Sequence, residues 1–559
     1  MARPSEYKPL LFTTTMRNPE RLKFLLFPLS KFKGQILDDN LTTIIVGETI
    51  RYGLYRPTKR IPQSVKEKWK TTPKGTFANS ILTDDEVKIV LENNDSTKWD
   101  DIKGHKEAGF DWGFPSRFAT IYDLTKELGL AYYAPQEPIV ISELGEHLLK
   151  SIEVNISGEE IVCNIVHPEY EQQVFLQAMA KSQRKNPFVR VLNDNIPLIL
   201  LLQTIKLLNA DERQNGAGIS RRELPLLIFW KDNDANALYN RIVKLRKQFG
   251  YNPSDEAVID ICVNEIMNGN FKKFDPKSIM VDYTDEFIRK MRITGLISLR
   301  GAGRFVDINK NELEKVEYVI NQYANYTHFS DEKAYFNHVA KLDKNLIKIK
   351  AKQVSATNAE KLLTKWLTQY AWEKIKKELA ILSSNGMSKD DVLKFIAAPS
   401  RLEFLTALAI KSKMPDVRVM PNYSCDDEGL PTSTAGGNKG DIECFEQQNG
   451  ILVEVTMATG RQQTMMEIWP IERHLADFQK EIKAQCVFVA PSIYNDSVRQ
   501  IQFISFETKG EKKIRPYTIK EFVDYLEKTR YLYEGDNYET EFSGINYIAA
   551  EPTAPYGMN

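Results

Sequence analysis

The stretch Gly-Asp-Ile-Glu-Cys-Phe-Glu-Gln-Gln-Asn-Gly-Ile-Leu-Val-Glu-Val-Thr, residues 440–456, is typical of two β-strands joined by a polar turn. Side chains alternate between the faces of a strand, so Glu454 shares one face with Leu452 and Thr456, whereas isoleucine and valine fill the other. An idle carboxylate in so apolar a strand would be costly to bury. Asp441 and Glu454 are therefore candidate functional residues, and a pair of solvated surface acids is the alternative.

The length of the turn decides whether Asp441 and Glu454 can act together. A two-residue turn at Asn449-Gly450 would place Glu454 opposite Phe445, about four residues or ~13 Å along the strand from Asp441. A loop of about four or five residues that begins at Glu446 would instead place Glu454 opposite Asp441 or its neighbour. We predict the longer loop, because it brings both carboxylates within reach of a shared ion.

The segments around this hairpin predict the rest of a mixed domain. The pattern predicts a helix over 401–411, a strand over 417–420, a long polar loop, the two strands of the hairpin, a helix near 470–483 and a strand over 486–489. This order, αβββαβ, is that of the PD-(D/E)XK nuclease core, in which one acid opens the second strand and another lies within the third. Asp441 and Glu454 occupy those positions.

The chemistry of phosphodiester hydrolysis fits these two acids. The substrate is anionic, and one or two Mg²⁺ ions can activate water and neutralise the developing charge. Because Mg²⁺ prefers oxygen ligands, we expect it to be the cofactor, held by Asp441, Glu454 and the carbonyl of Val455. Thr456 stands where this core usually has lysine and supplies no positive charge, so another group must take over that role.

Upstream of this core, two segments have the order of a winged helix. The first runs from a helix at 116–128 to Ile139-Val140-Ile141 and a second helix. The second has a helix at 284–294, then strands at 296–300 and 304–308 around Gly301-Ala302-Gly303. Winged helices place one helix in the major groove of DNA and the wing on its backbone. Interaction domains that do not contact nucleic acid are the alternative.

Clusters of basic residues indicate where DNA would bind. The chain has 75 Lys and Arg and 75 Asp and Glu, so any DNA-binding surface must be local. Residues 1–60 carry 11 Lys and Arg against five acids, although an ordinary solvated surface could do the same. A helix ending at Phe249 has a basic face opposite an apolar one. The predicted DNA-binding residues are Arg17, Arg21, Lys33, Arg241, Lys244, Arg300 and Arg304.

The fold class that follows is a multidomain α+β protein. We predict a mainly helical DNA-recognition region with winged-helix-like subdomains over 1–310, a helical linker over 311–395 and an α/β PD-(D/E)XK nuclease domain over 396–559. Five cysteines form no Cys-x-x-Cys pair, which argues against a zinc ribbon or a disulfide framework. Without a secretory signal or a membrane-spanning apolar run, a cytoplasmic location is expected.

Several motifs carry a more specific resemblance: Arg-Leu-Glu-Phe-Leu (401–405), Gly-Asp-Ile-Glu (440–443), Val-Glu-Val-Thr (453–456), Met-Glu…Ile-Glu-Arg-His-Leu (466–475) and, near the start, Phe-Thr-Thr-Thr-Met-Arg-Asn-Pro-Glu-Arg (12–21). With them the chain resembles the AlwI family of bacterial type IIS restriction endonucleases, a group that includes strand-specific nicking enzymes. The resemblance implies a restriction-modification system with a cognate DNA methyltransferase as partner. It implies an active site of Glu403, Asp441, Glu454, Glu467 and His474.

Each residue carried over by the resemblance has a structural alternative. Glu403 ends the sequence Ser400-Arg401-Leu402-Glu403, which matches a capping box that would merely satisfy the N-terminus of a helix. Glu467 is expected just before a helix that begins at Pro470. His474 is either a core histidine or a group that orients water or contacts the scissile phosphate.

The function that the sequence supports best is an endonuclease that binds a short asymmetric duplex site through its N-terminal half and cuts outside that site through its C-terminal half. The alternatives are a non-catalytic winged-helix DNA-binding protein and a structure-directed repair or recombination nuclease. One active site cuts one strand. Double-strand cleavage would therefore require a second copy of the chain, in a transient homodimer, or a second nuclease subunit, whereas a monomer would nick.

Overall fold

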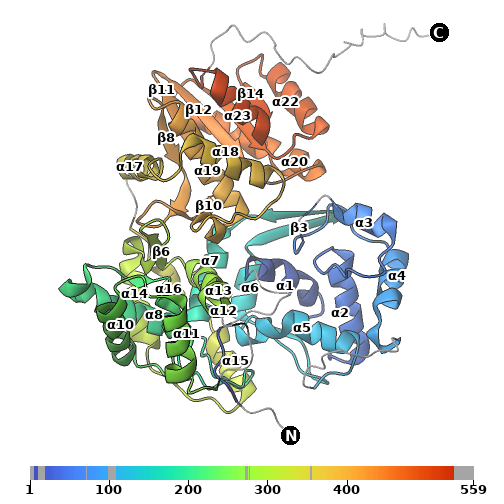
Figure 1. Cartoon of the computed structure of the whole chain (residues 1–559). Helices are drawn as coiled ribbons and strands as arrows, with labels where there is room; N and C mark the ends of the chain where they lie inside the picture. The colour runs from blue at the N-terminus through green and yellow to red at the C-terminus, as the bar shows by residue number, and fades with distance from the viewer. Residues whose placement is uncertain are drawn as a thin grey trace.

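The structure, a computed structural model, describes residues 5–10, 19–70, 72, 74–98, 109–270, 275, 277–352, 356–436 and 439–533. Arg17, one of the predicted DNA-binding residues, lies outside these ranges. Figure 1 shows the C-terminal part of the chain above a broader body formed by the preceding residues. The chain is a mixed α/β protein with small sheets, and none of its described helices is long and apolar enough to cross a membrane.

The N-terminal part is mainly helical and contains two short hairpins. Leu22, Leu25 and Leu26 recur on one face of its first helix and are fully buried. The predicted helix at 116–128 and the strand at 139–141 are confirmed. The elements are α1 (Leu22–Ser30), α2 (Asp39–Arg51), α3 (Gln63–Lys70), α4 (Asp84–Asn94), α5 (Phe114–Glu127), β1 (Ala131–Tyr132), β2 (Val140–Ile141), α6 (Glu143–Leu149), β3 (Ile152–Ser157) and β4 (Glu160–Ile165).

The middle of the chain surrounds a three-stranded sheet of order β5-β7-β6 with helices. The predicted hairpin is confirmed, since Arg300 pairs with Phe305 across residues 301–304. The helix ending at Phe249 is amphipathic, and Phe249 itself, in the last turn, is 47% exposed. The elements are α7 (Pro168–Lys181), α8 (Pro197–Ala210), β5 (Ile219–Ser220), α9 (Leu224–Ile228), α10 (Ala235–Phe249), α11 (Asp255–Asp260), α12 (Lys277–Met280), α13 (Asp282–Arg292), β6 (Ile297–Arg300) and β7 (Phe305–Ile308).

Helices also fill the segment predicted as a linker, which lies between this sheet and the C-terminal part. They are α14 (Leu313–Tyr323), α15 (Glu332–Ala340), α16 (Lys344–Lys348), α17 (Ala356–Trp366) and α18 (Trp372–Ser383), followed by the single turn η7 (Leu393–Phe395).

The C-terminal part is built on a five-stranded sheet of order β14-β13-β12-β11-β8. The β8, β11 and β12 strands are antiparallel, and β12, β13 and β14 are parallel. Helices α18, α19 and α23 cover one face and α20, α21 and α22 the other. The elements are α19 (Ala398–Lys413), β8 (Arg418–Pro421), β9 (Tyr423–Cys425), β10 (Pro431–Ala435), β11 (Ile442–Glu446), β12 (Asn449–Val455), α20 (Arg461–Met466), α21 (Ile468–Phe478), β13 (Ala484–Ala490), α22 (Asn495–Glu507), β14 (Ile514–Thr518) and α23 (Ile519–Lys528).

The β11–β12 hairpin differs from the prediction in its turn but not in its register. Residues 447–448 alone form the turn, because Glu446 also pairs with Asn449, so the predicted loop of four or five residues is wrong. The register of this ladder, extended by one pair, places Asp441 opposite Glu454. The two-residue turn at 447–448 therefore places Asp441 opposite Glu454, the pairing for which the longer loop was predicted. The expected polar loop after β8 also differs, since it contains the β9–β10 hairpin.

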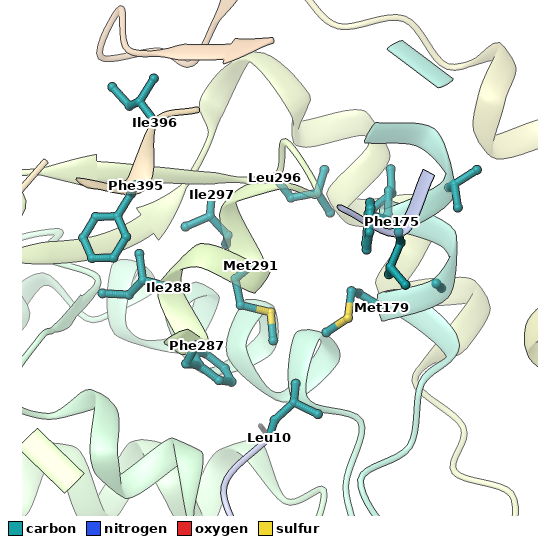
Figure 2. Packing of buried hydrophobic residues seen from close by; sticks show 14 of the residues in the cluster. Leu10, Phe175, Met179, Phe287, Ile288, Met291, Leu296, Ile297, Phe395 and Ile396 are labelled. Atoms are coloured by element: carbon teal, nitrogen blue, oxygen red, sulfur yellow. The ribbon is translucent and has the colours of Figure 1, made fainter. Parts of the chain in front are cut away.

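One apolar core connects the regions that the sequence analysis separated. Figure 2 shows part of it, where side chains from the N-terminal segment, α7, α13 and β6 meet residues of η7. The residues labelled there are Leu10, Phe175, Met179, Phe287, Ile288, Met291, Leu296, Ile297, Phe395 and Ile396. The C-terminal part therefore shares packing with the body beneath it.

Replacing Phe395 by alanine should test this shared core. Phe395 is 6% exposed, and a phenylalanine-to-alanine change at such a site lowers the free energy of unfolding by about 3–5 kcal/mol. Urea denaturation followed by tryptophan fluorescence measures the loss. The matched control is Phe506→Ala, at a side chain that is 83% exposed, for which we expect a change within about 0.5 kcal/mol. Equally small changes in the free energy of unfolding for the two variants would show that Phe395 is not part of the core.

Candidate active site

Five side chains from separate elements gather at one end of β12. Asp441 directly precedes β11, and Glu454 is the sixth residue of β12. Glu403 comes from α19, Glu467 lies between α20 and α21, and His474 belongs to α21. Neighbouring members of this cluster contact one another or affect one another's ionisation. The structure therefore brings together the five residues that the resemblance implied.

Asp441 and Glu454 form the centre of the cluster. Their carboxyl groups lie within hydrogen-bonding reach of each other. The amide of Val455 donates to Asp441 Oδ2 at 2.8 Å, which fixes that carboxyl against the adjacent strand. Gly440 leaves room for the pair, because a Cβ there would lie 2.9 Å from Glu454 Oε1 and 2.2 Å from Leu452 Cδ1.

Glu403 faces the cluster and does not cap its helix. Helix α19 begins at Ala398, so Ser400 and Glu403 both lie inside it and the capping-box alternative is wrong. Pro399 favours this earlier start, since proline fits the first turn of a helix. Glu403 is 3% exposed, and its Oε2 accepts a hydrogen bond of 3.2 Å from the amide of Ala435.

Glu467 contacts the side chain of Thr456, just after β12, and His474 contacts that of Glu454 within β12. Helix α21 begins at Ile468 rather than at Pro470, and Glu467 lies just before it, as expected. Thr456 donates from Oγ1 to Glu467 Oε1 at 2.7 Å. His474 Nδ1 lies 2.9 Å from Glu454 Oε1. His474 is therefore a partner of a site carboxylate rather than only a core histidine.

The four carboxyl groups perturb one another's ionisation. Burial, and then the Glu454 carboxylate, raises the pKa of Asp441 well above its ordinary value. Burial and then Glu467 raise the pKa of Glu454, and burial and then Asp441 raise that of Glu403. Burial also raises the pKa of Glu467, although the hydrogen bond from Thr456 opposes the shift. Such crowded carboxyls would be stabilised as anions by a bound cation.

The donor set fits a hard divalent cation. In the part of the chain that the structure describes, no group of three His, Cys, Asp or Glu side chains is arranged to hold a metal ion by itself. Mg²⁺ commonly takes only one or two carboxylates from a protein and completes its shell with water and phosphate oxygens. The adjacent carboxyls of Asp441 and Glu454 match that requirement.

Asn422 is a positioning residue that the sequence analysis missed. Its amide N–H donates to the carbonyl of Asp441 at 2.9 Å. Its side-chain Nδ2 donates to the carbonyl of Gly440 at 2.8 Å and to Glu443 Oε1 at 3.1 Å. These bonds fix the backbone that carries the Asp441 carboxyl. No local signal could reveal them, because the partners are 18 residues or more apart in sequence.

Two of the predicted DNA-binding arginines are already paired with acids. Both Nε and Nη2 of Arg241 bind Glu265, at 2.7 and 2.8 Å. Arg300 was predicted to bind DNA, but its side chain is 17% exposed and turns inward. Three carboxylates bind it there, those of Asp307 at 2.7 Å, Asp427 at 2.7 Å and Glu428 at 2.6 Å. The Arg300 guanidinium is therefore bound by acids of the protein itself.

The remaining predicted cations differ in exposure. Lys244 and Arg304 are exposed, on α10 and in the turn between β6 and β7. Lys33 is exposed and pairs with Glu146 at 2.7 Å. Arg21 is partly buried, and its Nη2 donates to the carbonyl of Leu54 at 3.3 Å.

The family model of the AlwI restriction endonuclease matches residues 126–396 and 337–525. The chain belongs to the AlwI restriction endonuclease family. This confirms the resemblance and makes the protein a restriction nuclease that binds DNA. The chain is also similar to the crystal structure of the small subunit (R.BspD6I2) of the heterodimeric restriction endonuclease R.BspD6I, with 24% identity and a TM-score of 0.24 over 28% of this chain and 76% of that chain. No curated protein matches it.

Removing one charge from the carboxyl cluster of this AlwI-family protein should stabilise the metal-free form. The pKa of Asp441 is raised by folding, so the associated stability is complete below the unfolded pKa and is lost as pH rises through the folded pKa. The asparagine in Asp441→Asn cannot ionise, so this variant does not lose that stability as pH rises. We expect its melting temperature in EDTA at pH 8 to exceed that of the wild type by about 2–4 °C, and the difference to vanish near pH 4.

Asp477→Asn is the matched control for this measurement. Asp477 lies on α21, and a hydrogen bond from Lys480 lowers its pKa. The control should therefore show no gain at pH 8. A melting temperature of Asp441→Asn at or below that of the wild type at pH 8 would contradict the repulsion inferred for the cluster.

Proposed function

We propose that this AlwI-family protein is a Mg²⁺-dependent type IIS endonuclease, with Glu403, Asp441, Glu454, Glu467 and His474 as its catalytic centre. The observation that carries the proposal is the placement of Asp441 opposite Glu454 on adjacent strands, with their carboxyls within hydrogen-bonding reach. Two solvated surface acids would have no reason to converge at a buried point. The burial of Glu454, which is 5% exposed, supports the same conclusion.

The surrounding elements support a nuclease core of the PD-(D/E)XK type. Helix α19 precedes an antiparallel trio of strands, β8, β11 and β12, and a helical crossover through α20 and α21 leads to the parallel strand β13. This is the αβββαβ order with one hairpin inserted after the first strand. The acids lie before the second strand and within the third strand of that trio.

In this centre, Asp441, Glu454 and the carbonyl of Val455 would hold the cation. Bound Mg²⁺ would supply a Lewis acid that lowers the pKa of a coordinated water and neutralises charge on the phosphate. The amide of Val455 holds the Asp441 carboxyl, and His474 orients that of Glu454. These contacts pre-organise the oxygens before substrate arrives.

Glu403 and Glu467 would add negative charge around a bound cation. The amide of Ala435 holds Glu403, and the hydroxyl of Thr456 holds Glu467. Thr456 thus positions the carboxyl of Glu467, whereas a lysine at residue 456 would have supplied a positive charge. A fully formed set of carboxylates binds a cation better than a protonated set, so cleavage should strengthen as pH rises through their raised pKa values.

The division of labour follows from the same fold. We propose that residues 1–310 recognise a short asymmetric duplex, that 311–395 connect the halves and that 396–559 cut. The sheet β5-β7-β6, with α8, α9 and α13 around it, supports a winged-helix-like subdomain. Because α13 is largely buried, exposed Lys244 of α10 and Arg304 of the hairpin are the better candidates for DNA contact.

In the part of the chain that the structure describes, we place one catalytic centre, which would cut one strand. The carboxyl cluster provides one set of ligands, so a monomer would nick, and a double-strand break would need a second copy or a second nuclease subunit. Methylation of the recognition site by a cognate methyltransferase would protect host DNA.

Loss of either central acid should abolish cleavage without abolishing binding. We expect Asp441→Asn and Glu454→Gln to lower the rate of plasmid cleavage in Mg²⁺ by about a thousandfold or more, because they remove metal ligands. Binding to a cognate duplex in Ca²⁺ should remain nearly intact. Asp477→Asn, at the exposed acid of α21 used above, should cut like the wild type.

The products of the wild type separate the candidate functions. Discrete fragments or discrete nicks indicate site-specific cleavage, a smear indicates a nuclease without defined sequence, and intact plasmid indicates a DNA-binding protein without catalysis. Cleavage by Asp441→Asn at the wild-type rate would contradict the assignment of Asp441 to the catalytic centre.

A further inference from the structure

The β9–β10 hairpin, together with the residue before it, extends from the catalytic centre to the wing, by which we mean strands β6 and β7. We call residues 422–435 the connecting hairpin. Figure 1 shows β10 where the C-terminal part meets the body below, close to β6. The sequence pattern predicted only a polar loop here, and the proposed function assigns the hairpin no task.

The base of the connecting hairpin holds two of the site's acids. At its first residue, Asn422 bonds to the backbone of Gly440 and Asp441. At its last residue, the amide of Ala435 donates to Glu403 Oε2 at 3.2 Å. Tyr423 and Ala435 pair with each other across the hairpin. A shift of the hairpin would therefore move the supports of Asp441 and Glu403 together.

The tip of the connecting hairpin is held first by Arg292, the last residue of α13. Arg292 Nη1 binds Asp426 Oδ2 at 2.8 Å, and Nη2 donates to the carbonyl of Pro431 at 2.9 Å. The two side chains of this ion pair are 4% and 0% exposed. A charge pair so deeply buried has little freedom to rearrange, since losing either partner would leave the other charge buried and uncompensated.

Arg300, at the end of β6, holds the other side of the tip. Its Nη2 binds Asp427 at 2.7 Å and its Nη1 binds Glu428 at 2.6 Å, while Nε remains on Asp307 of β7. The amide of Asp427 also donates to Asn309 Oδ1 at 3.1 Å. The planar guanidinium thus joins the wing strands to the hairpin through three carboxylates at once.

The tip itself is a rigid turn. Asp426 Oδ1 accepts hydrogen bonds from the amides of Glu428 and Leu430, each at 3.0 Å. Gly429 adopts φ of +82°, and a Cβ there would lie 2.7 Å from the Cβ of Leu362 in α17. Because the tip is internally hydrogen-bonded and packs on α17, it deforms little. A change in the position of Arg292 or Arg300 would therefore shift the whole connecting hairpin.

We propose that Arg300, acting with Arg292, is a positioning residue for hydrolysis: it fixes the connecting hairpin, which in turn fixes Glu403 and Asp441. The wing strands are thereby part of the catalytic machinery as well as of the recognition half. This proposal rests on the proposed nuclease function and concerns how its centre is kept in order. It gives Arg300 a role different from the DNA contact that the sequence predicted.

The test compares Arg300→Met with wild-type full-length protein by three readouts. These are the Kd for a duplex that the wild type cuts, measured by fluorescence anisotropy in Ca²⁺; the single-turnover cleavage rate at saturating enzyme in Mg²⁺; and the rise in melting temperature caused by Mn²⁺. We expect the rate to fall by about tenfold to a hundredfold, the Kd to stay within about twofold, and the Mn²⁺ effect to shrink.

Two further variants define the specificity of the effect. Arg300→Lys keeps the charge but cannot span three carboxylates, so its rate should lie between those of Arg300→Met and the wild type. Arg213→Met is the matched control, because Arg213 is 74% exposed and pairs with Asp211 at the surface, and its three readouts should match the wild type.

Asp427→Asn tests the same contact from the hairpin side and should reproduce the slower rate at unchanged Kd, even if Arg300→Met does not fold. A weaker Kd with an unchanged rate would make Arg300 a DNA contact and overturn the proposal. Unchanged values of all three readouts would also overturn it. If the wild type cuts no duplex, the proposed function fails by itself, and the Mn²⁺ effect still decides whether Arg300 orders the carboxyls.

Discussion

Repulsion among four crowded carboxyl groups is the constraint on which the C-terminal architecture depends. Burial and proximity raise the pKa values of Glu403, Asp441, Glu454 and Glu467, so the cluster opposes its own ionisation. Each acid therefore has a hydrogen-bond partner on another element, an amide, a hydroxyl or an imidazole. An assembly that is strained without a cation is well prepared to bind one, and active sites often contain such perturbed groups.

The same constraint explains how the C-terminal part is attached to the rest of the chain. Acids supported only by their own short strands would be free to move apart. The connecting hairpin, which supports two of them, is held to α13 by the buried Arg292–Asp426 pair. On the opposite face of the sheet, Gln462 at the start of α20 donates to the carbonyl of Cys163 in β4 at 3.0 Å, which links the helix before Glu467 to the N-terminal part. The N-terminal, middle and C-terminal parts of the described chain therefore share one apolar core.

Sequence reasoning predicted what depends on local periodicity and on the chemistry of the acids. The requirement that Asp441 meet Glu454 gave the right register even though the turn lies at 447–448. Sequence reasoning missed the features that depend on contacts between residues far apart in the sequence. The connecting hairpin has strands of three and five residues, too short for a periodic signal, and Arg300 shows its charge in the sequence but not the acids around it. The local motif at Glu403 permitted a cap as well as a site, and only the start of α19 at Ala398 distinguishes them.

The most direct test of the central claim is to locate the metal. Crystals of the full-length protein, soaked in Mn²⁺ at pH 8 without DNA, would be measured at the manganese absorption edge. We predict an anomalous peak within coordinating distance, about 2.2 Å, of carboxylate oxygens of both Asp441 and Glu454, and no such peak in crystals of Asp441→Asn. A peak elsewhere, or an unchanged peak in the variant, would contradict the assignment of these two acids as the metal ligands of the nuclease.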